Sequence, residues 1–338
     1  MTAPFWAEHA ELAGHYKDRA EWLELRRTGI GSSDCSAILG LGKYGSPFSV
    51  WVDKTARGVD DDGPSEAMEW GNILEPVIRD EFARRTELDV TACPTLRSLE
   101  RPWQLYNPDG LVLTENVLVE IKNASQWLAH EWVDGEVPDH AELQVQHGCA
   151  VTGADGAYVV GLVGGNRLRW EFVPRDDELI ALINEAEARL WDEHIVPDVQ
   201  PAIDGSSATE QAIGAVWARQ HGVERVTDRP LAVADAVLDY RVAQADEKAA
   251  LARKAKAKNE LLALMQGADV LTDEAGEPLV RLQRGQFREK DFMAEEPTAP
   301  EWLHKVEVVD RARMKTESPD LFRRYQSVSI RIPNPKKK

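Results

Sequence analysis

The sequence is poor in cysteine and holds no long apolar run. Its three cysteines, Cys35, Cys93 and Cys149, stand apart without the spacing of a metal site, as is typical of proteins from a reducing cytosol. No apolar stretch approaches the roughly 18 residues that would predict a membrane span. The N-terminal segment lacks the basic and apolar regions of a signal peptide. We therefore expect a cytoplasmic protein.

Positive charge is also scarce. Lysine and arginine number 40 against 58 aspartates and glutamates, which gives a formal net charge of −18. This balance argues against a protein that coats nucleic acid through bulk electrostatic attraction. It leaves room for an enzyme with a local positive groove, because an acidic exterior would repel nucleic acid everywhere else.

The rest of the composition predicts a packed globular protein. Hydrophobic residues make up 43% of the 338 positions and eleven residues are tryptophan, so the chain can bury a substantial core. The residue patterns predict an α/β core over residues 1–200, in which a mixed central sheet is flanked by helices. We expect a linker over 201–230, and a helical and small-β appendage over 231–338.

Local signals predict the elements of this core. We expect helices at about 1–30, 35–40, 47–58, 66–86, 125–133, 139–152 and 177–195. We expect strands at about 103–106, 111–114, 117–122, 157–163 and 167–173. Pro76 lies inside the helix at 66–86 and predicts a kink or a restart, which would aim the preceding Glu75. The appendage should begin with one or two helices over 231–266, followed by a small β element near 270–283.

Two short motifs carry the chemistry. Asn107–Gly110 predicts a turn that holds Asp109, and Val119–Lys122 predicts a strand. Because side chains alternate along a strand, Glu120 and Lys122 share one face. Two carboxylates and a lysine are what a metal-dependent phosphodiester hydrolase uses to hold a divalent cation and polarise water. Taken singly, the motifs also fit an ordinary turn and a solvated strand face.

Histidines and tryptophans also lie near these motifs. The histidines are His130, His140 and His147, and the tryptophans are Trp103, Trp127 and Trp132. The histidines lack ligand spacing, so we expect them in the core or on the surface, with a minor DNA role as an alternative for His147. We expect at least two of the tryptophans in the core, although such rings can stack on bases at a strand fork. The basic run Arg253–Lys258 predicts a solvated helix face, or a contact with DNA backbone.

Five segments, in order, carry a family resemblance. They are Arg27–Asp34, Gly71–Pro76, Pro108–Gly110, Glu120–Lys122 and Gln144–Gln146. Together they resemble the YqaJ-type viral recombinase family, the phage alkaline exonucleases related to lambda exonuclease. That family belongs to the PD-(D/E)xK nuclease superfamily. The resemblance covers about residues 20–200 and implies a restriction-endonuclease-like core.

The resemblance implies an activity and a metal site. The activity is a 5′→3′ exonuclease on double-stranded DNA, which leaves 3′ single-stranded overhangs for phage-type homologous recombination. One or two Mg²⁺ or Mn²⁺ ions would be held by Asp109 and Glu120, with the Ile121 carbonyl as an extra ligand. Glu75 would be a further ligand or would position a water of the metal's shell.

The resemblance also assigns the remaining catalytic groups. Lys122 would orient or activate the attacking water. Gln144 would support the site, and Gln146 is the weaker choice for that role. Hydrolysis needs an in-line hydroxide and neutralisation of phosphate charge, which a divalent cation and a lysine together supply.

A separate group would bind the end of the DNA. By resemblance, Arg27 and Ser33 grip the terminal 5′ phosphate, with the neighbouring Ser32 beside them. Arg26 can replace Arg27, because the sequence does not fix the register. An arginine can bind a terminal phosphate through two parallel hydrogen bonds, which would select 5′-phosphorylated ends.

The same resemblance implies partners and leaves alternatives. Family members are commonly toroidal homo-oligomers around DNA ends in a bacterial host, are encoded by phages or prophages, and often act with a single-strand annealing protein. The region after residue 200 is where such a protein would dock. The alternatives are a PD-(D/E)xK endonuclease, or a non-catalytic DNA-end or protein-binding module on the same core.

Overall fold

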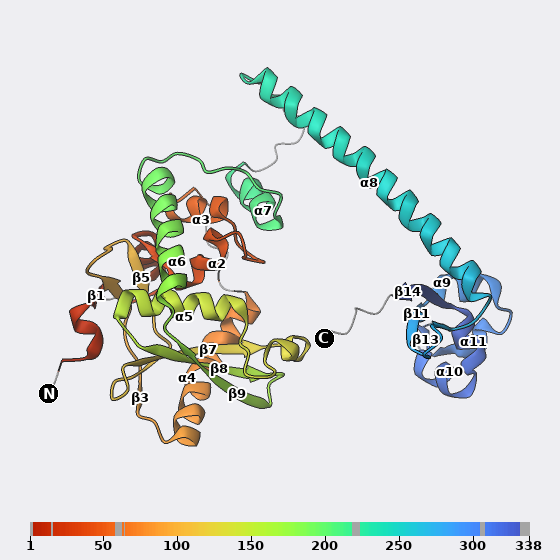
Figure 1. Cartoon of the computed structure of the whole chain (residues 1–338), viewed down its shortest axis with the longest axis horizontal. Coiled ribbons are helices and arrows are strands. Elements are labelled where there is room, and N and C mark those ends of the chain that lie inside the picture. The colour runs from red at the N-terminus through yellow and green to blue at the C-terminus, as the bar shows by residue number, and fades with distance from the viewer. Residues whose placement is uncertain are drawn as a thin grey trace. The chain divides into compact units, whose positions relative to one another are not determined.

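The chain consists of two compact units. The computed structural model describes residues 3–14, 16–57, 63, 65–217, 224–304 and 308–331. The units are Met1–Val223 and Glu224–Lys338 (Figure 1). None of the helices in these described ranges is both long and apolar enough to cross a membrane.

A five-stranded mixed sheet organises the first unit. Its strands lie in the order β3 (Val90–Thr91), β6 (Gly110–Val112), β7 (Val117–Ala124), β8 (Gly156–Val163) and β9 (Arg167–Pro174). Neighbours run antiparallel except β7 and β8, which are parallel. A parallel pair needs a crossover connection, and here that connection contains the helix α5 (Asp139–Thr152). The predicted α/β fold with a mixed central sheet is confirmed.

Helices cover both faces of this sheet (Figure 1). The helix α4 (Glu66–Thr86) buries Ile78 and Phe82 against one face, where they meet Val119 of β7. The helix α5 packs on the other face, where Val145 meets Leu118 of β7. The helix α6 (Asp177–Leu190) lies beside α5. The strand β7 is therefore buried on both sides from Val117 to Ile121, which fixes the position of the side chains in that stretch.

A second, smaller sheet was missed by the sequence patterns. It contains β1 (Ala10–Leu12), β4 (Leu96–Ser98), β5 (Gln104–Tyr106) and β2 (Ile30–Gly31), in that order. All four strands have two or three residues, too few to show an alternating pattern, and of them only β5 was expected, at 103–106. The expected helix over residues 1–30 is wrong for this reason. That segment holds a 3₁₀ turn (Phe5–Glu8), β1 and the helix α1 (Arg19–Arg27).

Several other boundaries differ from expectation. The helix α4 continues through Pro76 without a restart. The segment expected as a helix at 125–133 is a 3₁₀ helix (Gln126–Glu131), and α6 passes into a π-helical turn (Trp191–Ile195). The helix α7 (Ser207–Val216) lies within the expected linker and packs on α3 (Pro47–Lys54). The first unit thus extends beyond residue 200.

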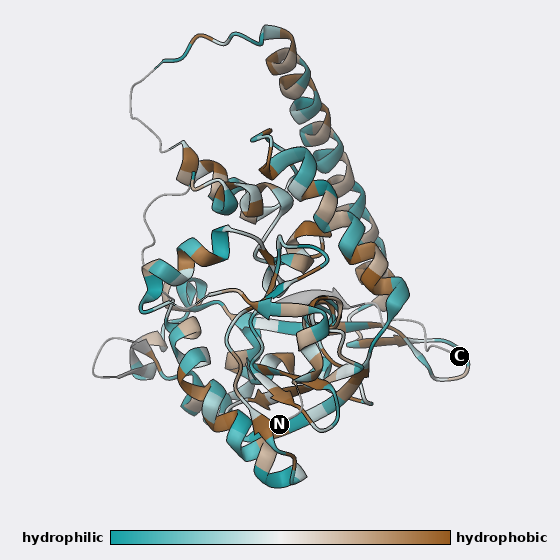
Figure 2. Cartoon of the chain, turned by 90° about the vertical axis from the view of Figure 1, so that its left-hand side faces the viewer, coloured by the Kyte–Doolittle hydropathy of each residue, from teal (hydrophilic) through white to brown (hydrophobic). Residues whose placement is uncertain are grey.

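The second unit begins with a long helix. This helix is α8 (Pro230–Met265), and hydrophobic and hydrophilic residues are interspersed along it (Figure 2). A three-stranded sheet follows, formed by β10 (Val270–Thr272), β11 (Pro278–Phe287) and β14 (Gln326–Arg331). The smaller elements are α9 (Glu289–Glu295), a 3₁₀ turn (Ala299–Trp302), β12 (Leu303–His304), β13 (Val308–Val309), α10 (Arg311–Glu317) and α11 (Pro319–Arg324). Aromatic residues fill the core between them.

Candidate active site

A hairpin brings the two chemical motifs together. The strands β6 and β7 pair antiparallel, with Gly110 opposite Val119. Asp109 stands immediately before β6, and its Oδ2 atom accepts a hydrogen bond from the backbone N–H of Ile121 at 2.6 Å. This bond fixes the carboxylate of Asp109 beside the segment that carries Glu120.

Only glycine fits at position 110. A Cβ atom there would lie 2.8 Å from Cγ1 of Val90 and 3.3 Å from Cβ of Val119. Contacts this short would force β6 away from its neighbours on both sides. The close approach of three strands therefore favours glycine at this position, independently of the turn that the sequence predicts.

Lys122 lies between two side chains of the site. Its Nζ atom donates a hydrogen bond to Oε1 of Glu120 at 2.5 Å, and another to Oε1 of Gln144 on α5. The expected alternation along β7 is confirmed, because Val119 and Ile121 pack in the core beneath α4. The structure thus brings Asp109, Glu120, Lys122 and Gln144 together.

Burial and like charges perturb the acids of this site. Burial raises the pKa of Asp109 well above its usual value, and the nearby Glu120 carboxylate raises it further. Burial also raises the pKa of Glu75, which Arg79 partly offsets. Burial alone would lower the pKa of Lys122, but Glu120 and Asp109 raise it above its usual value, so this lysine is a stable cation.

Glu75 lies at the margin of the site. Its carboxylate faces Arg79 one turn later on α4, with an N–O distance of 3.7 Å. Arg79 in turn donates to the backbone carbonyl of Asp109 at 2.9 Å. The carboxylate oxygens of Glu75, Asp109 and Glu120 do not all lie within 4.8 Å of one another. Within the described ranges, a single group of three side chains has its possible ligand atoms that close together, and it is a different one. Both expected roles of Glu75, as a further metal ligand or through a water of the metal's shell, stay predictions.

The donor set fits a hard divalent cation. Asp109 and Glu120 supply carboxylate oxygens, and the backbone of Ile121 supplies a carbonyl oxygen on the same segment. Two buried carboxylates that repel one another would be relieved by a bound cation, which the raised pKa of Asp109 reflects. Oxygen donors without thiolate or imidazole favour Mg²⁺ or Mn²⁺ over softer metals.

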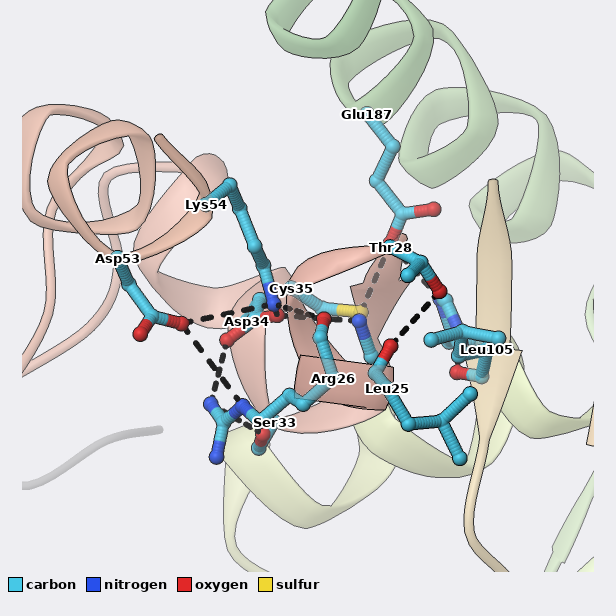
Figure 3. A network of polar contacts seen from close by, with 12 residues as sticks. Leu25, Arg26, Thr28, Ser33, Asp34, Cys35, Asp53, Lys54, Leu105 and Glu187 are labelled. Carbon is cyan, nitrogen blue, oxygen red and sulfur yellow. Dashed lines mark hydrogen bonds and ion pairs between the residues drawn. The ribbon is translucent and has the colours of Figure 1, made fainter. Parts of the chain in front are cut away.

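A second group of polar side chains surrounds Asp34 (Figure 3). Arg26 donates to Oδ1 of Asp34 at 2.9 Å and to Oγ of Ser33 at 3.4 Å. Lys54, whose side chain is 0% exposed, lies 2.8 Å from Oδ2 of Asp34 and donates to the backbone carbonyl of Arg26 at 3.1 Å. Burial alone would raise the pKa of Asp34, but Lys54 and Arg26 lower it well below its usual value.

The sequence patterns missed Lys54 and the pairing role of Asp34. Asp34 carried a signal only as the last residue of the family segment Arg27–Asp34, and Lys54 carried none, because a lysine at the end of α3 is usually solvated. Arg26 rather than Arg27 contacts Ser33, and which of the two arginines binds a phosphate stays a prediction. The Nε atom of Arg27 is buried without a hydrogen-bond partner among the described residues.

A cavity borders both groups, and of the first group it is lined by Gln144 but not by Asp109, Glu120 or Lys122. Its volume is about 830 Å³, and its walls include Arg26, Ser33 and Asp34 on one side and Gln144 on another. Neither Arg27 nor Ser32 belongs to this lining within the described part of the chain. One cavity therefore connects the arginine–serine pair with the glutamine that contacts Lys122.

A buried cluster braces the elements behind this cavity. Glu187 of α6 accepts hydrogen bonds from Cys35 (3.0 Å) and from Nδ1 of His147 (2.8 Å) through Oε1. Nε2 of His147 lies 2.9 Å from the carbonyl oxygen of Leu105, so both ring nitrogens act as donors. Burial alone would lower the pKa of His147, but Glu187 raises it above its usual value. The cluster is thus a charge-balanced pair, which confirms His147 as a core residue.

Other residues considered in the sequence have structural roles. The side chain of Gln146 donates to the carbonyl of Pro174 and accepts from the N–H of Asp176, so it faces the start of α6. Trp132 is 3% exposed, and Trp103 packs against a core cluster and stacks on the partly buried Trp191. Trp127 is 82% exposed. The expectation that at least two of the three tryptophans lie in the core is confirmed.

Comparisons with known proteins match this region. Residues 21–155 match the YqaJ-like viral recombinase domain. The uncharacterized protein YqaJ of Bacillus subtilis (strain 168) is 40% identical over 196 residues, which cover 57% of this chain and 61% of that relative. The chain thus spans about three-fifths of the length of the relative it matches.

Solved structures with weaker similarity include two exonucleases. The alkaline exonuclease LHK-Exo from Laribacter hongkongensis is 22% identical, with a TM-score of 0.44 over 52% of this chain and 91% of that one. A phage-related exonuclease from Haemophilus somnus 129PT is 16% identical, with a TM-score of 0.31 over 55% and 92% of the two chains. At these values neither structure bears on the activity of this chain. The resemblance to the YqaJ-type viral recombinase family is confirmed over residues 21–155.

Proposed function

We propose that this protein is a metal-dependent nuclease that digests one strand of double-stranded DNA from a 5′ end. The observation that carries the proposal is Lys122, a partly buried cation held between Glu120 and Gln144 beside Asp109. Such a constellation serves phosphodiester hydrolysis. The products would be mononucleotides and a 3′ single strand, a substrate for an annealing protein during recombination.

The proposed roles follow from the contacts. Asp109 and Glu120, with the Ile121 carbonyl, would hold Mg²⁺ or Mn²⁺, which supplies charge neutralisation and an acidified water. Gln144 restrains the ammonium of Lys122 at a fixed place, where it can orient a water or the scissile phosphate. Glu75 would receive a hydrogen bond from a water at the edge of the site.

The polar group around Asp34 supports action at a 5′ end. Arg26 and Ser33 line the cavity that reaches Gln144, and they offer N–H and O–H donors to a terminal phosphate. Asp34 and the buried Lys54 hold the Arg26 guanidinium and its backbone in place. A phosphate bound there would hold the 5′ end of a strand in the cavity that Gln144 also lines, so we expect digestion to proceed one nucleotide at a time.

An end-labelling experiment tests the proposal. Linear duplex DNA carries a label at one 5′ end or one 3′ end, with or without a 5′ phosphate, and is incubated with the full chain and Mg²⁺. We expect early release of labelled mononucleotide from the phosphorylated 5′ end and slower release from the unphosphorylated end. Absence of mononucleotides overturns the proposal, and cleavage of a closed circular plasmid supports an endonuclease instead.

Variants separate catalysis from binding. Glu120→Gln and Lys122→Met should each reduce the rate by about a thousandfold or more, because each removes charge at the reacting phosphate. The control is Glu171→Gln, a conservative change of an exposed residue on β9 of the same sheet. Retained binding to DNA ends by both inactive variants is expected. Unchanged digestion by both variants would show that hydrolysis does not depend on Glu120 and Lys122, and would overturn the proposed active site.

A further inference from the structure

The candidate metal ligand Asp109 lies in a short connection between the two sheets of the first unit. Residues 107–109 join β5 to β6, and these two strands belong to different sheets. Asp109 precedes β6, so its backbone is not part of a paired strand. A partly buried carbonyl that lacks a hydrogen-bond donor costs free energy. A contact from outside the two sheets is therefore needed to satisfy the carbonyl of Asp109.

Arg79 of α4 makes this contact. Its Nη1 atom donates a hydrogen bond to the carbonyl oxygen of Asp109 at 2.9 Å. The aliphatic part of the side chain packs beside Gly110, where an added Cβ atom would lie 3.4 Å from Cδ of Arg79. The side chain of Arg79 is only 18% exposed, so water competes little for the bond. A charged donor also makes a stronger hydrogen bond than a neutral one.

Asp109 is thereby held at two points. Arg79 binds its backbone carbonyl, and the backbone N–H of Ile121 binds its carboxylate at 2.6 Å. One contact comes from α4 and the other from β7, so the packing of a helix on the sheet sets the position of the ligand oxygens. A ligand that is fixed before a cation arrives loses little conformational freedom on binding, which raises affinity.

The same guanidinium carries a charge that opposes a bound cation. Its Nη1 atom lies 3.7 Å from Oε1 of Glu75, which is longer than a hydrogen bond. A positive charge close to the acids of the site weakens the binding of a divalent cation. Arg79 therefore has two effects of opposite sign on metal affinity, because it fixes Asp109 and repels the cation.

We propose that Arg79 is a positioning residue, whose hydrogen bond to the carbonyl of Asp109 raises the affinity of the site for Mg²⁺ or Mn²⁺. The inference rests on the proposed function, in which Asp109 is a metal ligand. The hydrogen bond is direct and partly buried, whereas the charge of Arg79 is partly neutralised by Glu75. Fixing of Asp109 therefore outweighs repulsion of the cation, and Arg79 acts without contacting the metal or the phosphate.

Binding of Mn²⁺ alone to the full chain tests the proposal. The dissociation constant is measured from the electron paramagnetic resonance signal of unbound Mn²⁺. Arg79→Met removes the donor and should raise this constant about tenfold or more, and Arg79→Lys, which keeps a charged donor, should recover part of the loss. An unchanged or lower constant in Arg79→Met shows that repulsion dominates and overturns the proposal. A wild type that does not bind Mn²⁺ overturns the proposed function, and the inference with it.

Arg85→Met is the matched control. Arg85 lies on the same helix and pairs with Glu81 four residues earlier at 2.7 Å, away from the acids of the site. Its replacement should leave Mn²⁺ binding unchanged, and an effect as large as that of Arg79→Met would overturn the proposal. Melting temperatures control for folding. Arg79→Gln, whose amide is too short to reach the carbonyl, gives the same test if Arg79→Met does not fold.

A double variant shows through which residue Arg79 acts. Arg79→Met should raise the dissociation constant by the same factor in the wild type and in the Glu75→Gln background. An effect that disappears in that background shows action through Glu75 and overturns the proposal. Digestion gives a second readout, because excess Mg²⁺ should restore the rate of Arg79→Met but not that of Lys122→Met. A rate of Arg79→Met that excess Mg²⁺ does not restore would also overturn the proposal.

Discussion

Replacing Asp34 should destabilise the first unit more than replacing its buried partner. Asp34→Asn keeps the shape of the side chain and removes its charge, so the ammonium of Lys54 stays buried with a carbonyl at 3.1 Å and Asp53 at 3.7 Å. Removing one partner of a buried ion pair costs about 3–5 kcal/mol. Because those two acceptors remain, we expect a loss near the lower end, about 3 kcal/mol of the free energy of unfolding.

Lys54→Met provides the comparison. The methionine fills the same apolar channel, and Asp34 keeps Arg26 at 2.9 Å and the N–H of Gly31 at 3.0 Å. No charge is then left buried without a partner, so we expect a loss of only about 1–2 kcal/mol. The order of the two variants, rather than either value, tests the role of the buried charge.

Urea unfolding followed by tryptophan fluorescence measures both losses. Ten of the eleven tryptophans lie in Met1–Val223, so the signal reports mainly on the first unit. The pKa of Asp34 is lower in the folded protein than in the unfolded chain, where it is near 3.8. The ionised carboxylate therefore stabilises the fold fully above about pH 3.8, and this contribution is lost as pH falls toward the folded-state pKa. The deficit of Asp34→Asn should therefore be constant from pH 7 to pH 5 and shrink below about pH 4. A deficit under about 1 kcal/mol, or a larger one for Lys54→Met, would refute the reasoning.

Three further changes test other parts of the structure. Gly148→Ala, whose Cβ would lie 2.7 Å from a tyrosine ring, should cost about 1–3 kcal/mol, whereas Gly214→Ala on α7 meets nothing and should be neutral or stabilising by thermal melting. The pKa of His147 is higher in the folded protein than in the unfolded chain. The protonated imidazole therefore stabilises the fold fully below about pH 6.5, and this contribution is lost as pH rises through the folded-state pKa. Glu187→Gln should therefore flatten the dependence of the melting temperature on pH. Asp109→Asn should raise the melting temperature of metal-free protein by a few degrees and abolish its response to Mg²⁺, because it removes buried like-charge repulsion; an unchanged Mg²⁺ response would contradict the metal site.

The sequence predicted the helices and strands that show a strong periodic pattern, and the contacts that depend on short-range geometry. The strand β7, the helix α5 and the hairpin of β8 and β9 were expected within two residues of their observed bounds. The face shared by Glu120 and Lys122 followed from alternation alone. The contact of Lys122 with Gln144 joins segments 22 residues apart, and only the ordered motifs hinted that they meet.

What the sequence missed depends on tertiary contacts. The strands β1 and β2 are too short to show a period, and they exist because they pair with β4 and β5. Lys54 becomes a buried partner of Asp34 only when α3 packs beside the Ser32–Asp34 turn, which no local pattern encodes. Continuation of α4 through a proline likewise reflects the packing that holds the helix together.

Closely spaced side chains of α5 contact different parts of the fold. Gln144 reaches Lys122, Gln146 ties down the backbone that precedes α6, and His147 enters the interior. Successive residues of a helix turn by about 100°, so one rigid segment fastens three separate parts of the fold. A substitution at 146 or 147, although remote from any phosphate, would therefore rotate or shift the amide that restrains the lysine. Tolerance to mutation along this helix should be low even where side chains never meet substrate.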